Sequence, residues 1–410
     1  MDNVTHSLAG WLVAEATLAM RAGSRSPGAP SAGFRTTLVA TSIVANNLPD
    51  FDFLYRGITP GKLGYLLHHR GHTHTVPGAL ALGVLALAVA LGVSRWRRAT
   101  FLPAERLTVV ALALAGPLLH VTMDFQNSYG VHPFWPLYDG WFYGDSIFIV
   151  EPLLFAVALP PLIFLAESRL VRGLLGVLLA AIIVAGATRR FVPLGSALAI
   201  SVLAVGSTFV ASRCRPDARA FVGIAGWVAI TLTFIVAGKL ASHLVRASSA
   251  SFFPTTEVVD DVRTPMPADP LCWSIWVLGT DGPDYVARKA VVSVWPGAVS
   301  SERCAGLERN APVASRPTQI TADHAVAWYS TFARPVSELR DLPRANCTAA
   351  AFLRFARAPF WTPPGSGWRT IGDLRFRGNQ GFGFAEVTAG AAPCPKNVPP
   401  WTPPRVDLLR

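Results

Sequence analysis

Charged residues are scarce in this chain. Asp, Glu, Lys and Arg make up 15% of its 410 residues, whereas typical soluble domains contain about 25%. Hydrophobic residues account for 51%, and the mean hydropathy is +0.38. This composition excludes an intrinsically disordered chain, a collagen and a coiled coil, and five cysteines in 410 residues exclude a disulfide-rich miniprotein. Much of the chain therefore belongs in a lipid bilayer.

The chain also lacks the basic residues that open a secretory signal peptide. It begins with Met1-Asp2, and its first apolar stretch, Thr5–Met20, has only sixteen residues. Signal peptides carry a positively charged region before their apolar core. We therefore expect this stretch to stay in the protein as a partial or re-entrant helix, with a cleaved signal as the alternative.

Apolar stretches of near-spanning length recur through the first 240 residues. A membrane-spanning helix needs about 20 mainly apolar residues. We predict an α-helical polytopic membrane protein with about eight spans: Thr5–Met20, Thr36–Leu54, His74–Ser94, Leu107–Met123, Ile147–Ala166, Leu170–Thr188, Phe191–Ala211 and Phe221–Leu240.

The basic residues between these stretches predict the orientation. Of the net charge of +11, residues 1–247 carry +8, from 19 basic and 11 acidic residues. Twelve basic residues lie on one set of alternate loops: Arg21, Arg25, Arg35, Arg95, Arg97, Arg98, Arg106, Arg169, Arg172, Arg213, Arg215 and Arg219. The other set has five: Arg56, Lys62, Arg70, Arg189 and Arg190. The positive-inside rule places the first set in the cytoplasm of an inner-membrane protein, and we expect no nucleic-acid binding. The N-terminus, loops 55–73 and 124–146 and everything after about residue 241 then lie outside.

The composition changes near residue 248, where Pro, Gly and aromatic residues punctuate short alternating runs. We predict three segments. Residues 1–155 contain membrane-embedded helices that carry a candidate metal site, residues 156–247 contain additional transmembrane helices, and residues 248–410 form a small β-rich extracytoplasmic domain. Strands are expected at Cys272–Leu278, Tyr285–Trp295, Ala325–Phe332, Ala350–Phe355, Trp368–Phe376 and Phe382–Val387. The Pro-rich segments Pro359–Gly367 and Pro393–Pro404 are expected to be loops.

Four of the five cysteines lie in the C-terminal segment, residues 248–410, which is called the tail below. Cys272, Cys304, Cys347 and Cys394 form an even set in the domain placed outside, whereas Cys214 stands alone beside a cytoplasmic loop. Two disulfides are expected in an oxidising compartment, although the sequence does not select among the three pairings. Four buried free thiols are the alternative.

Histidines are concentrated in the first third of the chain. Seven of nine lie within residues 6–132, at the ends of the first four apolar stretches or in the loops that join them, on the side predicted to be external. Asp2 with His6, and His120 with Asp124, are spaced i, i+4, which puts each pair on one helix face where both side chains can bind one metal ion. A helix-terminal ion pair or cap is the alternative.

Two further motifs add ligands. Asp50 and Asp52 follow Pro49, and carboxylates so close repel each other unless a cation lies between them; a solvated turn with a capping Asp is the alternative. The loop His68-His69-Arg70-Gly71-His72-Thr73-His74 offers several imidazoles around a flexible glycine. Mixed His and Asp ligands favour zinc or manganese over calcium, with iron as another candidate. A metal ion lowers the pKa of the water it binds, which suits a hydrolytic site.

These residues resemble a known family, the membrane-bound metal-dependent hydrolases of the YdjM/YbcI type. The resemblance covers about residues 1–155 closely. It rests on Met1-Asp2 with Thr5-His6, Leu48-Pro49-Asp50-Phe51-Asp52, His69-Arg70-Gly71 with Thr73-His74, His120 with Asp124, Asn127-Ser128-Tyr129-Gly130, Phe134-Trp135-Pro136 and Gly144-Asp145-Ser146 up to Glu151-Pro152.

The resemblance implies a set of metal ligands and an activity. The implied ligands are Asp2, His6, Asp50, Asp52, His69, His74, His120 and Asp124. His72 is treated as secondary, His132 as a loop residue, and Glu151 stands where the family is expected to have Asp. The family is distantly similar to zinc-dependent phospholipase C and single-strand nucleases, which suggests phosphoester hydrolysis by analogy.

Three functions fit this reading. In the first, the chain is a metal-dependent hydrolase acting on a phosphoester or lipid-linked substrate, with Asp52 or Asp124 as general base and Arg70 stabilising negative charge. In the second, it is a metal transporter, which would need polar residues across the whole bilayer. In the third, it is a non-catalytic scaffold in which metal ties helix ends together and the tail binds a protein or envelope polymer.

Overall fold

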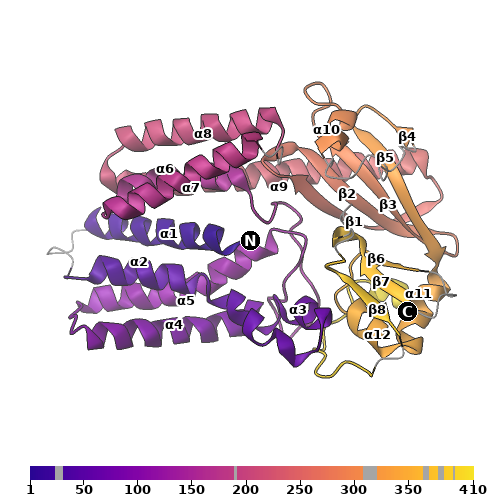
Figure 1. Cartoon of the computed structure of the whole chain (residues 1–410), viewed down its shortest axis with the longest axis horizontal. Coiled ribbons are helices and arrows are strands. Elements are labelled where there is room, and N and C mark those ends of the chain that lie inside the picture. Colours follow the sequence, from indigo (N-terminus) through magenta and orange to yellow (C-terminus); the bar gives the residue numbers. More distant parts are fainter. Residues whose placement is uncertain (24–30, 189–191, 308–320, 363–368, 377–382, 391–392) are drawn as a thin grey trace. The chain divides into compact units, whose positions relative to one another are not determined.

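The computed structural model (Figure 1) divides into two compact units, each described here by itself. It describes residues 1–23, 31–188, 192–307, 321–362, 369–376, 383–390 and 393–410. The first unit comprises Met1–Phe51, Thr73–Asn127 and Ile147–Thr233, and the second comprises Asp52–His72, Ser128–Ser146 and Phe234–Arg410. The segment boundaries expected near residues 155 and 247 stay predictions. Arg25, Arg189, Arg190, Phe191, Trp368 and Phe382 lie outside the described residues.

The first unit is a helix bundle. α1 packs on α2 and α6, α2 on α4 and α5, α4 on α5, and α6 on α7 and α8. The bounds are α1 Asn3–Gly23, α2 Phe34–Ala45, η1 Leu48–Leu54, η3 His72–His74, α4 Val76–Trp96, α5 Pro103–Phe125, α6 Pro152–Leu165, α7 Arg169–Thr188, α8 Leu194–Arg213, η4 Pro216–Ala218 and α9 Arg219–Phe252, with η1, η3 and α9 continuing into the second unit.

Five helices in the described part of the chain are long and apolar enough to cross a membrane. They are Val76–Trp96, Pro103–Phe125, Arg169–Gly186, Leu194–Arg213 and Pro216–Phe252. They match the third, fourth, sixth, seventh and eighth stretches expected from hydropathy. The chain is thus a mainly helical membrane protein.

The other three expected spans have a different form, so eight spans are not confirmed. α2 has 12 residues and ends at Ala45; after Asn46 and Asn47 the chain continues as the 3-10 helix η1, which contains Pro49. α6 has 14 residues and begins at Pro152, with Glu151 as its N-cap. Its residues from Pro152 to Leu162 are all buried, as in a core helix. α1 has 21 residues but is not among the five.

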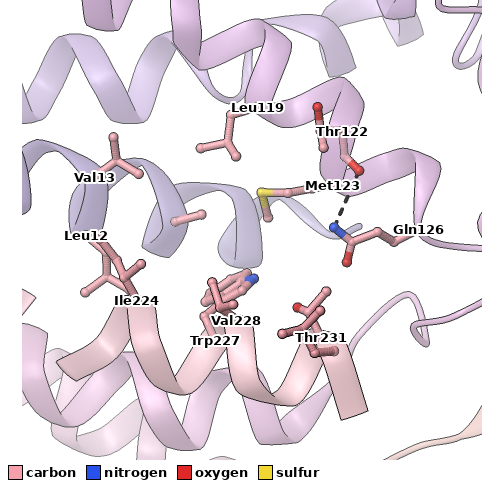
Figure 2. Close-up of a pocket in the computed structure, with 12 residues that line it drawn as sticks. Leu12, Val13, Leu119, Thr122, Met123, Gln126, Ile224, Trp227, Val228 and Thr231 are labelled. Atoms are coloured by element: carbon pink, nitrogen blue, oxygen red, sulfur yellow. Dashed lines mark hydrogen bonds between the residues drawn. The ribbon is translucent and has the colours of Figure 1, made fainter. Parts of the chain in front are cut away.

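A cavity of about 240 Å³ lies within the bundle (Figure 2). Residues of α1, α5 and α9 line it, among them Leu12, Met123 and Val228.

The second unit is built on a five-stranded antiparallel sheet with the order β1-β2-β3-β5-β4 (Figure 1). Its central hairpin joins β2 to β3 through Gly282, whose φ of 58° suits a residue without a side chain. The strands are β1 Thr256–Met266, β2 Asp269–Asp281, β3 Asp284–Ser293, β4 Thr321–Ala322 and β5 Val326–Pro335. Three of the expected strands, those that start at residues 272, 285 and 325, are confirmed here.

A second antiparallel sheet has the order β6-β7-β8, with β6 Pro359–Trp361, β7 Arg369–Asp373 and β8 Glu386–Ala389. The expected strand Ala350–Phe355 is wrong, because most of it lies in α12, where Asn346 accepts a hydrogen bond from Ala349 N and caps the helix. The loop expected at Pro359–Gly367 begins instead with β6. The other elements are η2 Arg56–Ile58, α3 Lys62–His68, α10 Ser301–Leu307, α11 Val336–Ala345, α12 Cys347–Leu353, η6 Leu374–Phe376 and α13 Val406–Leu409.

Two disulfides link cysteines within the tail, as expected. Cys272 pairs with Cys304 and Cys347 with Cys394, while Cys214 is free. Two inter-helix loops, residues 52–72 and 128–146, pack with the tail in this unit. Trp401 Nε1 donates to Leu67 O at 2.8 Å, and Arg375 donates to Ser128 O at 2.7 Å. The loops that hold part of the predicted site are therefore held by the tail.

Candidate metal centre

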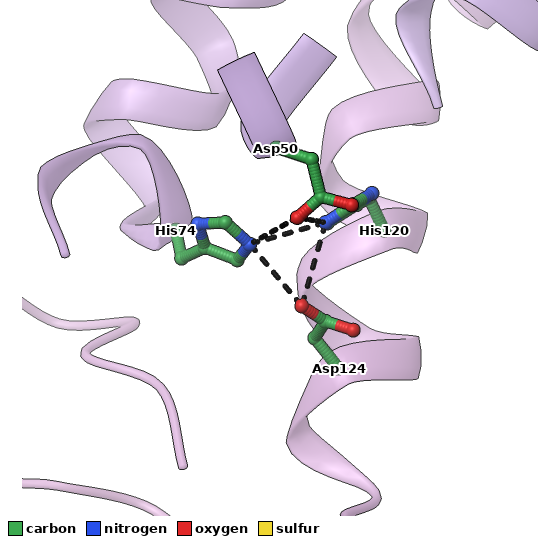
Figure 3. Close-up of side chains that lie close together, drawn as sticks. All are labelled: Asp50, His74, His120 and Asp124. Carbon is green, nitrogen blue, oxygen red and sulfur yellow. Dashed lines mark hydrogen bonds and ion pairs between the residues drawn. The ribbon is translucent and has the colours of Figure 1, made fainter. Parts of the chain in front are cut away.

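Four side chains of the first unit converge on one point (Figure 3). Asp50, His74, His120 and Asp124 each offer a ligand atom, and these atoms all lie within 4.8 Å of one another. His74, His120 and Asp124 are fully buried. The four side chains come from η1, η3 and α5, which are separate elements of the sequence. All four residues belong to the ligand set that the sequence predicted.

α5 supplies two of the four candidate ligands. His120 and Asp124 are one turn apart on the same helix face, with His120 Nε2 3.5 Å from Asp124 Oδ2. α5 lies close to α2 because Gly116 has no side chain: a Cβ there would be 2.7 Å from Ala45 Cβ. This close approach lets His120 Nδ1 reach the carbonyl oxygen of Asn46 at 2.7 Å. The position of the His120 ring is thus set by α2 as well as by α5.

The other two candidate ligands, Asp50 and His74, lie in short 3-10 helices. Asp50 belongs to η1, and its Oδ1 is 3.5 Å from His120 Nε2 and 3.7 Å from His74 Nε2. His74 immediately precedes Thr75, which caps α4 by accepting a hydrogen bond from Gly78 N.

The donor chemistry of the cluster fits a metal ion. A carbonyl oxygen only accepts, so His120 Nδ1 must donate to Asn46, and in the neutral ring Nε2 then carries a lone pair. This lone pair faces His74 Nε2 at 3.1 Å and the Asp124 carboxylate at 3.5 Å. Acceptors gathered in this way repel one another unless a proton or cation lies among them. Two imidazoles and two carboxylates are also a ligand set suited to a divalent transition metal.

His6 and Asp2 lie at the start of α1 and play different parts. His6 Nε2 is 3.3 Å from Asp124 Oδ1, and its ring stacks on His120 with centroids 3.7 Å apart. Asp2 Oδ1 accepts hydrogen bonds from Val4 N and Thr5 N, both at 3.0 Å. The amino group of Met1 forms an ion pair with Asp124. His6 therefore borders the cluster, whereas Asp2 caps α1, which was the alternative reading of its spacing.

A second group of predicted site residues lies in the second unit. Asp52 is fully buried; its Oδ1 lies 3.0 Å from His69 Nδ1, and its Oδ2 accepts from Arg70 N at 2.7 Å. Arg70 has a φ of 59°, and its guanidinium lies over the Tyr129 ring, 5.1 Å from the centroid. The roles predicted for Asp52 and His69 as ligands, and for Asp52 and Arg70 in catalysis, stay predictions.

The structure shows the contacts of three residues whose roles the sequence left open. His72 packs against Trp135 and Trp401, and burial lowers its pKa. His132 is buried and stacks on Trp401 with centroids 3.9 Å apart. Glu151 caps α6 by accepting from Leu153 N at 3.1 Å.

Sequence reasoning missed Asn46, which holds two parts of the site. Its carbonyl oxygen accepts from His120, and its side-chain amide donates to His6 O. The ring nitrogen of a ligating histidine that faces away from the metal usually donates to such a partner. The only signal available was the position of Asn46 at the start of the Asn-Asn-Leu-Pro-Asp motif.

One comparison with known proteins found a match. The family model described as YdjM inner membrane protein matches residues 1–192. No curated protein and no solved structure shows a significant match. The matched segment contains every residue of the cluster and most of the helix bundle. The family resemblance is thereby confirmed over residues 1–192, which are similar to the YdjM inner membrane protein family.

Proposed function

We propose that the chain is a metal-dependent hydrolase of the inner membrane, acting on a phosphoester or lipid-linked substrate at the external face. The observation that supports this most is the buried cluster of Asp50, His74, His120 and Asp124. Buried carboxylates and imidazoles at the end of membrane helices are costly, so they are retained where they bind an ion or do chemistry.

Zinc is the metal we propose, with manganese and iron as alternatives. Two imidazoles and two carboxylates bind all three ions, and cysteine, which would favour softer metals, is absent from the cluster. When bound, such an ion supplies a water nucleophile at neutral pH and polarises the bond to be cleaved. His74 and His120 would hold it through their Nε2 atoms.

The protein groups would position the substrate and move a proton. Asp124 contacts both ligand histidines and His6, so we propose that a carboxylate oxygen not engaged by metal accepts the proton of the attacking water. Asp52 is the alternative general base. Arg70, which cannot lose its proton, would stabilise negative charge on a phosphoryl oxygen.

The proposal also includes an orientation and a span count. The twelve basic residues on alternate loops favour a cytoplasmic position for those loops, which puts the cluster and the tail outside. α1, α2 and α6 would complete the membrane-embedded bundle beside the five long apolar helices.

The deciding experiment measures metal content and cleavage together. The full chain is purified in detergent, its metals are quantified by elemental analysis, and a panel of phosphoesters is tested after zinc or manganese loading. We expect stoichiometric metal and cleavage of at least one phosphoester. His120→Ala should weaken metal binding by at least about tenfold, whereas His324→Ala, at an exposed position of the tail, should change neither property.

Two outcomes would contradict the hydrolase. Absence of stoichiometric metal from wild type would remove the basis of the mechanism. Stoichiometric metal whose removal lowers the melting temperature, with no cleavage of any substrate, would favour the scaffold, because the cluster ties η1, η3 and α5 together.

A further inference from the structure

The cavity within the bundle is built from helices that also hold the metal cluster. Leu119 and Met123 of α5 line it, and each directly precedes a ligand, His120 and Asp124. Successive helix residues are separated by about 100°, so the cavity lies against the neighbouring face of the same two turns. On α1, Ala9 lines the cavity one turn after His6.

The cavity is apolar along most of its length and reaches away from the cluster. Leu12 and Val13 lie about two turns, roughly 10 Å, beyond His6 along α1. α9 closes the opposite side with Ile224, Trp227 and Val228 (Figure 2). The volume of about 240 Å³ is below the roughly 300–1,000 Å³ of sites that enclose a whole small molecule. It is suited to one hydrocarbon chain rather than to an entire lipid.

The surroundings of the cavity are also apolar. α5 and α9 are two of the five helices able to cross a membrane. Val228 and Leu232, which line the cavity, are 48% and 54% exposed in the protein. On a membrane-spanning helix such exposed apolar side chains face lipid, so a lipid chain can enter sideways from the bilayer.

Two residues with polar side chains border one end of the cavity. Gln126 and Thr231 lie at this end in Figure 2, opposite Leu12 and Val13. The hydroxyl of Thr231 is buried without a hydrogen-bond partner among the described residues. This is unusual, because a helical threonine commonly donates to the carbonyl four residues earlier, as Thr233 does to Ala229 O at 2.9 Å. The Thr231 hydroxyl is thus an unsatisfied donor beside this end of the cavity, and it is not exposed to the cavity in this structure.

We propose that this cavity binds one acyl chain of a glycerophospholipid, with the ester carbonyl at Thr231 and the headgroup directed to the side of the metal cluster. The placement of the headgroup makes glycerophospholipids the substrate class of the proposed hydrolase, and this part of the proposal rests on that function. The acyl-chain part rests only on the apolar lining, the exposure to lipid and the unsatisfied hydroxyl of Thr231.

Photolabelling tests the chain site without requiring catalysis. The full-length protein is placed in nanodiscs of phosphatidylethanolamine and phosphatidylglycerol, in which the phosphatidylglycerol carries a diazirine in one ester-linked acyl chain. After irradiation, the labelled residues are mapped by mass spectrometry. We expect Met123, Ile224 and Val228 to be labelled far more than Val205, a 69% exposed residue of α8 that reports on ordinary surrounding lipid.

Two matched pairs of variants probe the two ends. Ala9→Leu fills the apolar part and should reduce the excess labelling about tenfold, whereas Ala88→Leu, at an exposed position of α4, should leave it unchanged. Thr231→Val removes the free hydroxyl and should reduce it about fivefold, whereas Thr233→Val should not. An ether-linked probe should bind the wild type as weakly as the ester probe binds Thr231→Val.

The outcomes separate this inference from the proposed function. Equal labelling of the cavity and of Val205, or labelling unaffected by Ala9→Leu, would overturn the acyl-chain site even if soluble phosphoesters are cleaved. Selective labelling in a protein that cleaves nothing would leave the site standing and remove only the hydrolase. If both hold, Ala9→Leu should raise KM for a phospholipid and leave KM for a soluble phosphoester unchanged.

Discussion

Arg357 illustrates how single residues hold the second unit together. Its guanidinium donates to both oxygens of Asp145 at 2.9 and 2.8 Å and to both oxygens of Asp260 at 2.8 and 3.0 Å. Asp145 comes from an inter-helix loop, Asp260 from β1, and Arg357 follows α12. Burial by itself raises the pKa of Asp260, but the charge of Arg357 and its hydrogen bonds outweigh it and keep this pKa below its ordinary value.

This shift predicts a pH dependence of stability. The unfolded chain binds a proton at Asp260 near pH 4, whereas the folded protein does so only at lower pH, so unfolding takes up protons in acid. The stabilisation is complete above about pH 4 and is lost as the pH falls through the folded-state pKa. Asp260→Asn should lower the free energy of unfolding at pH 7 by about 3 kcal/mol. Tryptophan fluorescence during denaturant unfolding between pH 3 and 7 measures this.

An exposed ion pair provides the control. Asp341 pairs with Arg344 at 3.7 Å, and both side chains are largely exposed. Asp341→Asn should therefore change the free energy of unfolding by less than about 1 kcal/mol. Equal effects of the two substitutions would contradict the role assigned to burial.

At the scale of elements, the site depends on how closely helices approach. Gly10 of α1 lies against α2, where a Cβ would be 2.8 Å from Ser42 O, and Gly116 brings α5 against Ala45. The Gly116 contact positions α5, which carries His120 and Asp124, and the Gly10 contact positions α1, which carries His6 beside the cluster. Small residues at such positions are how membrane helices pack in the absence of a hydrophobic driving force.

A pair of glycine substitutions tests this dependence. Gly116→Ala would place a Cβ 3.1 Å from Asn46 N as well as against Ala45, so we expect a loss of about 1–3 kcal/mol of stability and weaker metal binding. Gly92→Ala in α4 meets nothing within 4 Å and should stabilise the helix by about 0.5–1 kcal/mol. Thermal unfolding and zinc competition with a chelator measure both effects. The same response from both variants would refute the packing argument.

At the scale of the whole molecule, the positions of the cysteines bear on the predicted orientation of the chain in the membrane. Disulfides persist in oxidising compartments, and both lie in the tail, whereas the free Cys214 follows α8 next to a basic loop. The predicted topology therefore puts the tail and Cys214 on opposite sides of the inner membrane.

Thiol labelling of spheroplasts measures this topology. After mild reduction, a membrane-impermeant maleimide should label Cys347 and Cys394 in intact spheroplasts. Cys214 should react only after permeabilisation. Labelling of Cys214 in intact cells, with the tail cysteines protected, would reverse the orientation and move the proposed active site to the cytoplasm.

Local sequence patterns predicted much of the fold. They failed where helix caps and chain breaks set boundaries that hydropathy and residue alternation do not reveal. Hydropathy identified α4, α5, α7, α8 and α9, because a long apolar run has few alternatives to a spanning helix. It overextended α2, which ends at Ala45, and α6, which begins only at Pro152 after the Glu151 cap. In the tail, the Asn346 cap turned an apolar, alternating segment into α12 rather than a strand.

By itself, the sequence determined that this is a membrane protein and that histidines and aspartates collect at one set of helix ends. The i, i+4 spacing placed His120 and Asp124 on one face, because that geometry is local to a helix. Which of the eight expected ligands share one point was decided only by tertiary structure. Asp50 and Asp124 are 74 positions apart in sequence, and their approach depends on the Gly116 contact and on the Asn46 carbonyl that orients His120. Such long-range packing leaves no periodic signal along the chain.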